Sequence, residues 1–477
     1  MTQNDAFDRW QARERDAEEM IPLIGRLHRD RGVTVVVHSK TLVNKSTISI
    51  LKAHRAARQV EGDELSVVDT LPVLRAVVAA GPGPARIDLG MLLVGFRESG
   101  ATDLPAYVAT QLAPVLGANK VSPSGPRDVV LYGFGRIGRL VARLLIEKAE
   151  TTSGLRLRAV VIRKSGENDV TKRASLLRRD SIHGAFQGSI VVDEENDTII
   201  ANGNEIRFIY ADSPEQVDYT SYGIRDAILI DNTGRWRDRA GLSQHLRPGI
   251  AKVVLTAPGK GDVPNIVHGV NQGSVDPRER IVSCASCTTN AIVPPIKAME
   301  DRFGIVSGHV ETVHSFTNDQ NLADNFHSAD RRGRAATLNM VITETGAASA
   351  IKKALPDLTA TISGNAIRVP TPDVSIAVLN LRLKEETTKE EVLAHLREVS
   401  LRGPLKRAID YTTAKDAVSS DFIGSRSAVT VDGNAAIVNG DNAILYLWYD
   451  NEFGYSTQVI RVVQAVSGTE VPALPAV

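Results

Sequence analysis

The sequence has few cysteines, few aromatic residues and no net charge, and each of these shortages excludes a class of protein. Only Cys284 and Cys287 occur among the 477 residues, so no disulfide framework can stabilise the chain. Lys and Arg together number 56, as do Asp and Glu, and this balance argues against nucleic-acid binding through general electrostatic attraction. Hydrophobic residues make up 43% of the chain, which is typical of a globular protein and too high for a disordered one.

The chain also lacks long apolar runs and a secretory leader. Its longest apolar stretches, such as Met91–Phe96 and Ala443–Tyr449, are far shorter than the ~18 residues that a membrane-spanning helix needs. The first residues, Met1–Glu19, carry charges of both signs and no apolar segment followed by a cleavage site. We therefore expect a cytoplasmic protein that binds neither membrane nor nucleic acid.

The length of the chain predicts about three domains, at roughly 150 residues per domain. Residues 1–126 are expected to form a mainly helical N-terminal extension, with one β-branched run at Val33–Val37 that favours a strand. The segment 121–126 (VSPSGP) is typical of a linker. From residue 127 on, short apolar strands alternate with helical patterns, which predicts an α/β fold with a parallel sheet.

A glycine-rich turn, residues 133–138 (GFGRIG), follows the strand expected at Val129–Tyr132 and opens an amphipathic helix. The pattern G-x-G-x-x-G in this context is typical of a dinucleotide site, because the glycines allow bare backbone to approach a pyrophosphate at the helix N-terminus. The alternative is an ordinary turn between a strand and a helix, since glycine triplets occur by chance in many loops.

The second strand, expected at Leu157–Ile162, ends in Arg163 and Lys164 and not in the acidic residue that accepts the ribose hydroxyls of NAD. Two cations at this point pair favourably with a 2′-phosphate, so NADP is favoured over NAD. The alternative is that both cations are solvated and that Glu167 or Asp169 contacts the ribose.

Both cysteines lie in residues 283–290 (SCASCTTN), between an expected strand and an expected helix. Three interpretations are open: a redox pair, half of a metal site, or a single nucleophile, Cys287, whose thiolate the helix N-terminus stabilises. No further cysteine exists to complete a zinc site, so we expect no metal. A thioredoxin-like pair would normally lie near the start of a small domain. A single nucleophile needs a base, and His314, which follows a strand-like run, is the candidate.

Six motifs occur in order along residues 127–470. They are GFGRIGR (133–139), ASCTTN (285–290), TVHSFTNDQ (312–320), TETGAA (343–348), RVPTPDVS (368–375) and WYDNEFGYS (448–456). In identity and spacing they resemble phosphorylating glyceraldehyde-3-phosphate dehydrogenase of the bacterial type. The resemblance implies a doubly wound Rossmann NAD(P)-binding domain at 127–285 and an α+β catalytic domain at 286–450. It also implies a C-terminal helix, within 451–477, that returns to the first domain, and assembly into a homotetramer.

The same resemblance implies a mechanism and a set of site residues. Cys287 would attack the aldehyde carbon of glyceraldehyde 3-phosphate, with its backbone N–H as an oxyanion donor, and His314 would lower the thiol pKa and take the hydroxyl proton. Hydride transfer to the nicotinamide and attack by inorganic phosphate would give 1,3-bisphosphoglycerate, in glycolysis or, in reverse, gluconeogenesis. The positions that match the phosphate pockets are Ser286, Thr288, Thr317, Thr345, Gly346 and Arg368. Those that match the cofactor contacts are Gly133, Gly135, Arg136, Ile137, Gly138, Thr233, Gly234, Thr256, Asn451 and Tyr455, in addition to Arg163 and Lys164.

Three features depart from the family pattern. Lys164 stands where NAD-specific members carry aspartate and Asn325-Phe326 where they carry Leu-Pro, and both changes favour NADP while leaving NAD open. Cys284 replaces the usual asparagine; it is either a buried filler, which we favour, or the partner of Cys287 in a reversible disulfide.

Two other functions remain open under the same resemblance. One is erythrose-4-phosphate dehydrogenase, a sister enzyme without strong phosphate dependence. The other is a regulatory protein on an inactive dehydrogenase scaffold, against which the intact Cys287 and His314 argue. Residues 1–126 match nothing in the compact members, although extended members with such a helical front segment exist. A packed structural appendage is the favoured interpretation, and the alternatives are a cover for the cofactor cleft, an oligomer contact or a binding site for a regulator.

Overall fold

The computed structural model describes residues 3–118, 125–149 and 154–476. The chain forms two compact units, of which the first comprises residues 1–126, 150–154 and 469–477 and the second residues 127–149 and 155–468. Residues 121–124 of the expected linker lie outside the described residues. None of the helices in the described ranges is long and apolar enough to cross a membrane.

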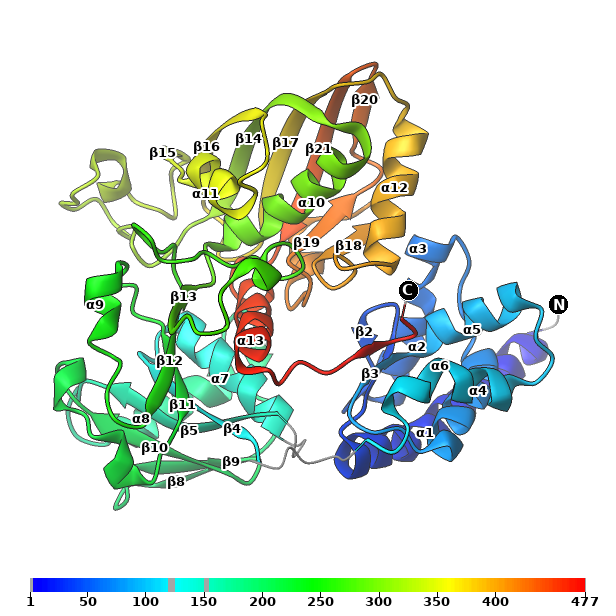
Figure 1. Cartoon of the computed structure of the whole chain (residues 1–477), viewed down its shortest axis with the longest axis horizontal. Helices are drawn as coiled ribbons and strands as arrows, with labels where there is room; N and C mark the ends of the chain where they lie inside the picture. The colour runs from blue at the N-terminus through cyan, green and yellow to red at the C-terminus, as the bar shows by residue number, and fades with distance from the viewer. Residues whose placement is uncertain (1–2, 119–124, 150–153, 477) are drawn as a thin grey trace. The chain divides into compact units, whose positions relative to one another are not determined.

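The first unit is mainly helical and contains a small sheet in the order β2-β1-β3-β22 (Figure 1). The strand expected near Val33–Val37 is present as β1. The fourth strand, β22, comes from the C-terminus, where Ala473 and Leu474 pair in parallel with Arg86 and Ile87. The unit consists of α1 (Gln3–Arg31), β1 (Thr34–Val37), β2 (Lys40–Thr41), α2 (Thr47–Ala56), α3 (Arg58–Glu61), α4 (Val67–Ala80), β3 (Arg86–Asp88), α5 (Leu89–Ser99), α6 (Leu104–Leu112) and β22 (Ala473–Leu474).

The second unit begins with an eight-stranded sheet in the order β13-β12-β11-β4-β5-β10-β9-β8. The six strands from β13 to β10 are parallel, and β9 and β8 add an antiparallel edge. The strands are β4 (Arg127–Tyr132), β5 (Leu155–Ile162), β8 (Ile190–Asp193), β9 (Thr198–Ala201), β10 (Asn204–Tyr210), β11 (Ala227–Asp231), β12 (Ile250–Leu255) and β13 (Ile281–Ser283). The central strands are apolar runs buried on both faces, which parallel strands between helices require.

Helices α7 (Arg136–Ala149), α8 (Asp169–Arg178) and α13 (Phe453–Ser467) pack against one face of this sheet. The other face is covered by the short helix α9 (Arg239–Ser243) and by loops and 3-10 turns. Strand β4 lies beside β11, although the chain reaches β11 only after building β5 and β10 on the other side. The loops after β4 and β11 therefore diverge from neighbouring carboxyl ends, which is where doubly wound folds bind ligands.

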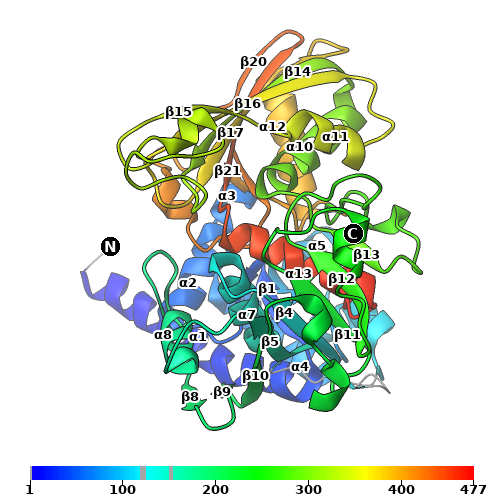
Figure 2. The same cartoon turned by 90° about the vertical axis from the view of Figure 1, so that its left-hand side faces the viewer.

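The second sheet of this unit is mixed, with the order β15-β16-β14-β17-β21-β19-β18. Its elements are α10 (Cys287–Phe303), β14 (Ile305–Ser315), β15 (Val341–Glu344), α11 (Ala347–Ala354), β16 (Thr361–Val369), β17 (Ser375–Leu383), α12 (Lys389–Leu401), β18 (Ile409–Thr412), β19 (Val429–Asp432), β20 (Ile437–Asn439) and β21 (Asn442–Tyr449). In both views α13 lies between the two large sheets of this unit (Figures 1 and 2).

The predicted fold class, a Rossmann domain and an α+β domain preceded by a helical extension, is confirmed. The range expected for the C-terminal helix, 451–477, is too long. Helix α13 ends at Ser467, and the residues after Gly468 belong to the first unit. The edge strand β22 is only two residues long, too short for a periodic pattern to reveal it.

Candidate active site

Cys287 is the first residue of α10, at the junction where β13 gives way to the helix. The Ser286 side chain caps the helix by accepting a hydrogen bond from the backbone N–H of Thr289 at 3.0 Å. Ala285 has a φ of 56°, in the left-handed region that favours glycine, and its carbonyl oxygen accepts the Tyr455 hydroxyl at 2.9 Å. A capped helix end and a buried tyrosine therefore fix the position of the Cys287 sulfur.

His314, near the end of β14, reaches the same point from the second sheet. Its Nε2 lies 3.5 Å from Cys287 Sγ, and its Nδ1 lies 2.7 Å from the carbonyl oxygen of Ser315. Burial, aided by the charge of Arg368, lowers the pKa of His314 to about 3, so the imidazole is neutral. The tautomer whose Nδ1–H donates to Ser315 leaves Nε2 free to accept the thiol proton.

Burial has the opposite effect on Cys287, whose pKa it raises, while the Arg368 charge and hydrogen bonds from Thr288 act to lower it. The helix N-terminus and His314 predict a thiolate, but in the structure burial outweighs the influences that lower the Cys287 pKa. The pair at rest is thus a thiol beside a neutral base, poised for proton transfer during attack.

Arg368 is brought to this pair by the sheet, since the parallel register of β14 and β16 sets His314 beside Arg368. One guanidinium nitrogen lies 2.8 Å from His314 Nδ1 and donates to the Ser315 carbonyl oxygen at 3.2 Å. The Nε of Arg368 is buried and makes no hydrogen bond with any described residue. A guanidinium group with an unused donor beside the nucleophile is suited to bind an anion.

The other residues expected to bind phosphate are placed at varying distances from this pair. Thr288 is buried in the first turn of α10, with Oγ1 3.1 Å from the Tyr449 hydroxyl. The Thr317 hydroxyl donates to Asp319, which also pairs with Arg332. Thr345 and Gly346 form the start of α11 and, in the described part of the chain, make no hydrogen bond to Cys287 or His314.

The glycine-rich turn joins β4 to α7 at the point where β4 and β11 diverge. A Cβ on Gly133 would lie 2.9 Å from the Thr233 side chain, and one on Gly138 would lie 2.6 Å from the Gly133 carbonyl oxygen. A Cβ on Gly135 would meet nothing within 4 Å. Two glycines are thus needed for close packing and the third borders open space, as backbone approach to a pyrophosphate requires.

The side chain of Arg136 is already engaged. It donates to Glu452 at 2.6 and 2.5 Å and to Asp180 at 3.1 and 3.2 Å. Its backbone N–H and that of Ile137, in the first turn of α7, are therefore the groups that remain for a phosphate.

Residues expected near the nicotinamide and adenosine follow the carboxyl ends of β11, β12 and β21. Thr233 donates from its backbone N–H and its hydroxyl to buried Asp231, both at 2.7 Å, and Gly234 continues the turn with a φ of 61°. The Thr256 hydroxyl donates to the Asp231 carbonyl oxygen at 3.1 Å. These bonds fix the loop that faces the glycine-rich turn.

Asn451 is oriented by two serines that the sequence analysis did not assign. Its Oδ1 accepts the hydroxyls of Ser315 and Ser375, both at 2.8 Å, so its amide NH2 is left to donate. Both serines lie inside the recognised motifs, in TVHSF and PDVS, but their role depends on a contact between distant strands that no local pattern encodes.

The two cations at the end of β5 face different surroundings. Burial raises the pKa of Tyr132 to about 12, and the charges of Arg163 and Arg235 act to lower that pKa. Lys164 instead lies over the ring of Tyr210, 5.0 Å from its centroid, and borders a depression also lined by Glu167. Arg163, unlike Lys164, is thus among the charges that act on Tyr132, the last residue of β4.

Asp169, an alternative ribose contact in the sequence analysis, is buried and already bonded. Its carboxylate accepts from Arg173 at 2.5 Å and from the Ser165 backbone N–H at 3.2 Å. Glu167 is exposed and remains a candidate for contact with the ribose.

A buried ionic cluster beneath the site was missed by the sequence analysis. Ligand-type atoms of His183, Asp373 and Asp450 lie within 4.8 Å of one another, and Glu452 lies 3.3 Å from His183. Although burial opposes it, the bond to Glu452 and the neighbouring carboxylates raise the pKa of His183. Burial and the charge of Asp450 raise the pKa of Asp373 to about 8. The charged imidazolium of His183 thus pairs with the Glu452 carboxylate beside a protonated Asp373.

Comparisons with known proteins agree with this geometry. Residues 127–239 match the family profile described as glyceraldehyde 3-phosphate dehydrogenase, NAD binding domain, and residues 286–451 match the profile of its C-terminal domain. A glyceraldehyde-3-phosphate dehydrogenase-like protein of Pseudomonas aeruginosa is 55% identical over 96% of this chain and its own full length. Glyceraldehyde-3-phosphate dehydrogenases of Zymomonas mobilis and Geobacillus stearothermophilus are each 38% identical, over 72% and 71% of this chain respectively and 98% of their own lengths.

Proposed function

Because the chain belongs to the glyceraldehyde-3-phosphate dehydrogenase family, we propose that it oxidises glyceraldehyde 3-phosphate with NAD(P) and inorganic phosphate to 1,3-bisphosphoglycerate, and also catalyses the reverse reaction. The observation that carries this proposal is the 3.5 Å separation of Cys287 Sγ and His314 Nε2 at the start of α10. An inactive regulatory scaffold would have no need to keep a buried thiol beside a buried neutral base.

The first step is attack of the Cys287 sulfur on the aldehyde carbon. His314 Nε2 accepts the thiol proton, and the C–S bond forms as the carbonyl oxygen gains a negative charge. The backbone N–H of Cys287, at the amino end of α10, is free of an intrahelical partner and is the proposed donor to that oxygen. Return of the proton from His314 to that oxygen gives a thiohemiacetal on Cys287.

The bound nicotinamide supplies a hydride acceptor for the oxidation of this thiohemiacetal. His314 again accepts a proton, this time from the hydroxyl, and a thioester remains on Cys287. Inorganic phosphate attacks the thioester carbon and the thiolate leaves. Arg368, Thr317, Ser286, Thr288, Thr345 and Gly346 are the residues proposed to hold the substrate phosphate and the attacking phosphate.

The residues proposed to hold the cofactor fit its parts in turn. The open space beside Gly135 and the first N–H groups of α7 suit a pyrophosphate, and the free NH2 of Asn451 suits a carboxamide oxygen. Arg163 and Lys164 are proposed to receive the 2′-phosphate of NADP, with Arg235 adding to the local positive charge. NADP acceptance is therefore proposed, alongside NAD.

We further propose a homotetramer in the cytoplasm. The segment between Thr317 and β15 exposes large apolar side chains, which a partner subunit would cover. The most exposed are Leu322 (68%), Phe326 (91%), Leu338 (81%) and Met340 (76%). Both cysteines are free thiols, which suits a reducing compartment.

The decisive experiment is the initial rate with glyceraldehyde 3-phosphate, with and without inorganic phosphate, using NAD and NADP in parallel. We expect a phosphate-dependent rate with both cofactors and a higher kcat/KM with NADP. Phosphate-independent oxidation, together with a higher kcat/KM for erythrose 4-phosphate, would identify the sister activity instead. No rate with either aldehyde would leave only the regulatory scaffold.

A further inference from the structure

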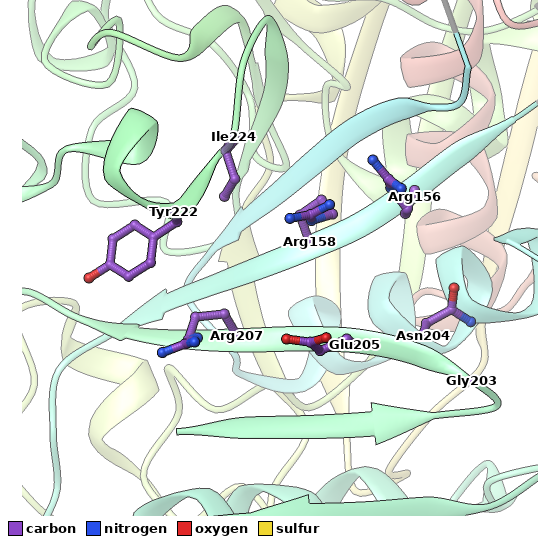
Figure 3. A pocket seen from close by; sticks show the side chains of 8 residues that line it. All are labelled: Arg156, Arg158, Gly203, Asn204, Glu205, Arg207, Tyr222 and Ile224. Carbon is purple, nitrogen blue, oxygen red and sulfur yellow. The ribbon is translucent and has the colours of Figure 1, made fainter. Parts of the chain in front are cut away.

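A second cationic site lies on the cofactor sheet, away from the proposed cofactor contacts. A depression of about 340 Å³ is bordered by Arg156 and Arg158 of β5, Arg207 and Glu205 of β10, and Tyr222 and Ile224 (Figure 3). Figure 3 shows the first two arginines in succession along β5 and Arg207 on the neighbouring strand. Its volume is within the range of small-molecule sites.

The depression lies on the less covered face of the sheet. Ile224 belongs to the apolar cluster beneath α9, whereas Ile206 and Phe208 face the cluster beneath α7 on the opposite side. Side chains alternate along a strand, so Glu205 and Arg207 share the face of Ile224. Among the described residues of the second unit, loops and short turns cover this face near the amino ends of β5 and β10, and the three arginines are partly exposed.

Arg156 and Arg158 share one face of β5 by regular alternation with Leu155 and Leu157, and a bulge follows at this point of the strand. In the pairing with β4, Leu157 lies opposite Val129 and Ala159 lies opposite Val130, so Arg158 is the extra residue. Such an insertion turns a side chain out of the regular alternation, and bulges are common beside functional sites. Here the bulge turns Ala159 to the face that Arg156 and Arg158 already share.

The protein neutralises the charges of the depression only in part. Arg156 is paired, donating to Asp128 at 2.7 and 2.9 Å. The side chains of Arg158 and Arg207 make no hydrogen bond or ion pair with any described residue. The charge of Arg207 acts on Asp193 only through space. The carboxylates of Asp128 and Glu205 balance the charges of two of the three arginines, so a net positive charge remains. Neighbouring like charges are unfavourable unless an anion lies between them.

The site is also separate from the proposed cofactor contacts. The carboxyl end of β5, with Arg163, is five residues beyond Arg158, which is about 16 Å along an extended strand. In the parallel pairing of β5 and β10, Arg207 lies opposite Ala159, the residue after Arg158, and three residues before the end of β10. One molecule of NADP at the glycine-rich turn would not need this depression.

From these observations we propose that the depression is a second binding site for a phosphate-bearing small molecule. Arg158 and Arg207 bind phosphate oxygens through paired N–H donors, Arg156 adds charge from beside them, and Tyr222 offers an aromatic ring at the rim. The ring makes a nucleoside polyphosphate the favoured occupant, since a base stacks on an exposed aromatic side chain. Inorganic polyphosphate shares the same anionic chemistry.

The test is isothermal titration of the full chain with ATP or with tripolyphosphate, after the cofactor site has been saturated with NAD or NADP. We expect the wild type to bind one ATP per chain, and the Arg158→Gln/Arg207→Gln variant to bind it about 10- to 100-fold more weakly. The matched control is Arg278→Gln/Arg382→Gln, which removes the same charge from two surface ion pairs and should bind as the wild type does. Thermal unfolding of each variant verifies that the fold is kept.

A further variant, Tyr222→Ala, separates the two sources of anion. Weaker binding of ATP with unchanged binding of tripolyphosphate supports a nucleotide, and equal effects on both support a polyphosphate at the same arginines. Equal ATP affinity of the wild type and the double-arginine variant overturns the proposal. So does binding that disappears when the cofactor site is full. Both results are independent of any dehydrogenase rate, so they are distinguishable from failure of the proposed reaction.

Discussion

The two units of the chain differ in how they use buried polar side chains. In the described part of the first unit these are His28, His38, His54 and Thr70, and their partners are close at hand. His54, for example, bonds through Nδ1 to the Ile50 carbonyl oxygen at 2.8 Å and through Nε2 to Thr70 at 2.7 Å. Such bonds satisfy polar groups inside a helical core, although Nδ1 of His38 is buried and makes no hydrogen bond with any described residue.

In the second unit, buried polar side chains from distant segments meet at one place. Cys287, His314 and Asn451 come from α10, β14 and the loop after β21, and each keeps one polar atom available. The comparison leads us to expect that the chemistry lies in the second unit and that the first is a packed structural appendage. The predictions below test this division, beginning with the largest effect.

Replacement of Cys287 by Ser should remove the dehydrogenase activity and leave both units folded. A serine hydroxyl beside a neutral imidazole is a far weaker nucleophile toward the aldehyde, and we expect kcat to fall by about 10³-fold or more. Steady-state rates and two-transition calorimetry check both parts of the prediction. A Cys287→Ser variant that keeps full aldehyde oxidation refutes the nucleophile assignment.

How far the sequence predicted this site depends on whether a contact is local. The helix cap at Ser286, the glycine-rich turn and the pairing of Cys287 with His314 follow from motifs, because each motif carries its own geometry. The hydrogen bonds from Ser315 and Ser375 join β14 and β17 to Asn451, in the loop after β21. Only the strand order of the sheet brings these three residues together.

The remaining misses have the same physical origin. Arg136 pairs with Asp180 and Glu452, which lie 44 and 316 residues away in sequence. Nothing near the glycine-rich turn therefore indicates that the Arg136 side chain is already engaged. Burial is likewise a property of the whole fold, which is why the direction of the Cys287 pKa was not foreseen. Strand β22, only two residues long, lies outside any periodic signal.

Replacement of Leu474 by Ala should destabilise the first unit alone. Leu474 is 3% exposed in the apolar core of that unit, and a buried Leu→Ala change costs about 2–5 kcal/mol of unfolding free energy. We expect the calorimetric transition of the first unit to move to lower temperature while kcat/KM stays within about twofold. Leu242→Ala is the matched control, since Leu242 is fully buried in the second unit. Loss of activity in Leu474→Ala at temperatures where the first unit remains folded would contradict the division.

Replacement of Lys164 by Asp should change cofactor choice without affecting stability. A carboxylate at the end of β5 repels a 2′-phosphate and accepts ribose hydroxyls, so the ratio of kcat/KM for NADP over NAD should fall about 10- to 100-fold. Arg163→Ala is the companion variant, because the charge of Arg163 acts on Tyr132. Equal ratios in the wild type and both variants would place NADP discrimination elsewhere on the chain.

Replacement of Cys284 should have the smallest effect of these variants. It tests the comparison of the two units closely, because cysteine is a reactive residue type but Cys284 lies in an apolar core. It is fully buried among the apolar side chains of the cofactor sheet, and burial raises its pKa well above the ordinary range for a thiol. A protonated thiol without access to solvent is a poor partner for an oxidised Cys287. We therefore expect Cys284→Ala to lose activity to peroxide, and to regain it with dithiothreitol, within about twofold of the wild-type rates. Reversible inactivation in the wild type and irreversible inactivation in Cys284→Ala would show instead that Cys284 protects Cys287 through a disulfide.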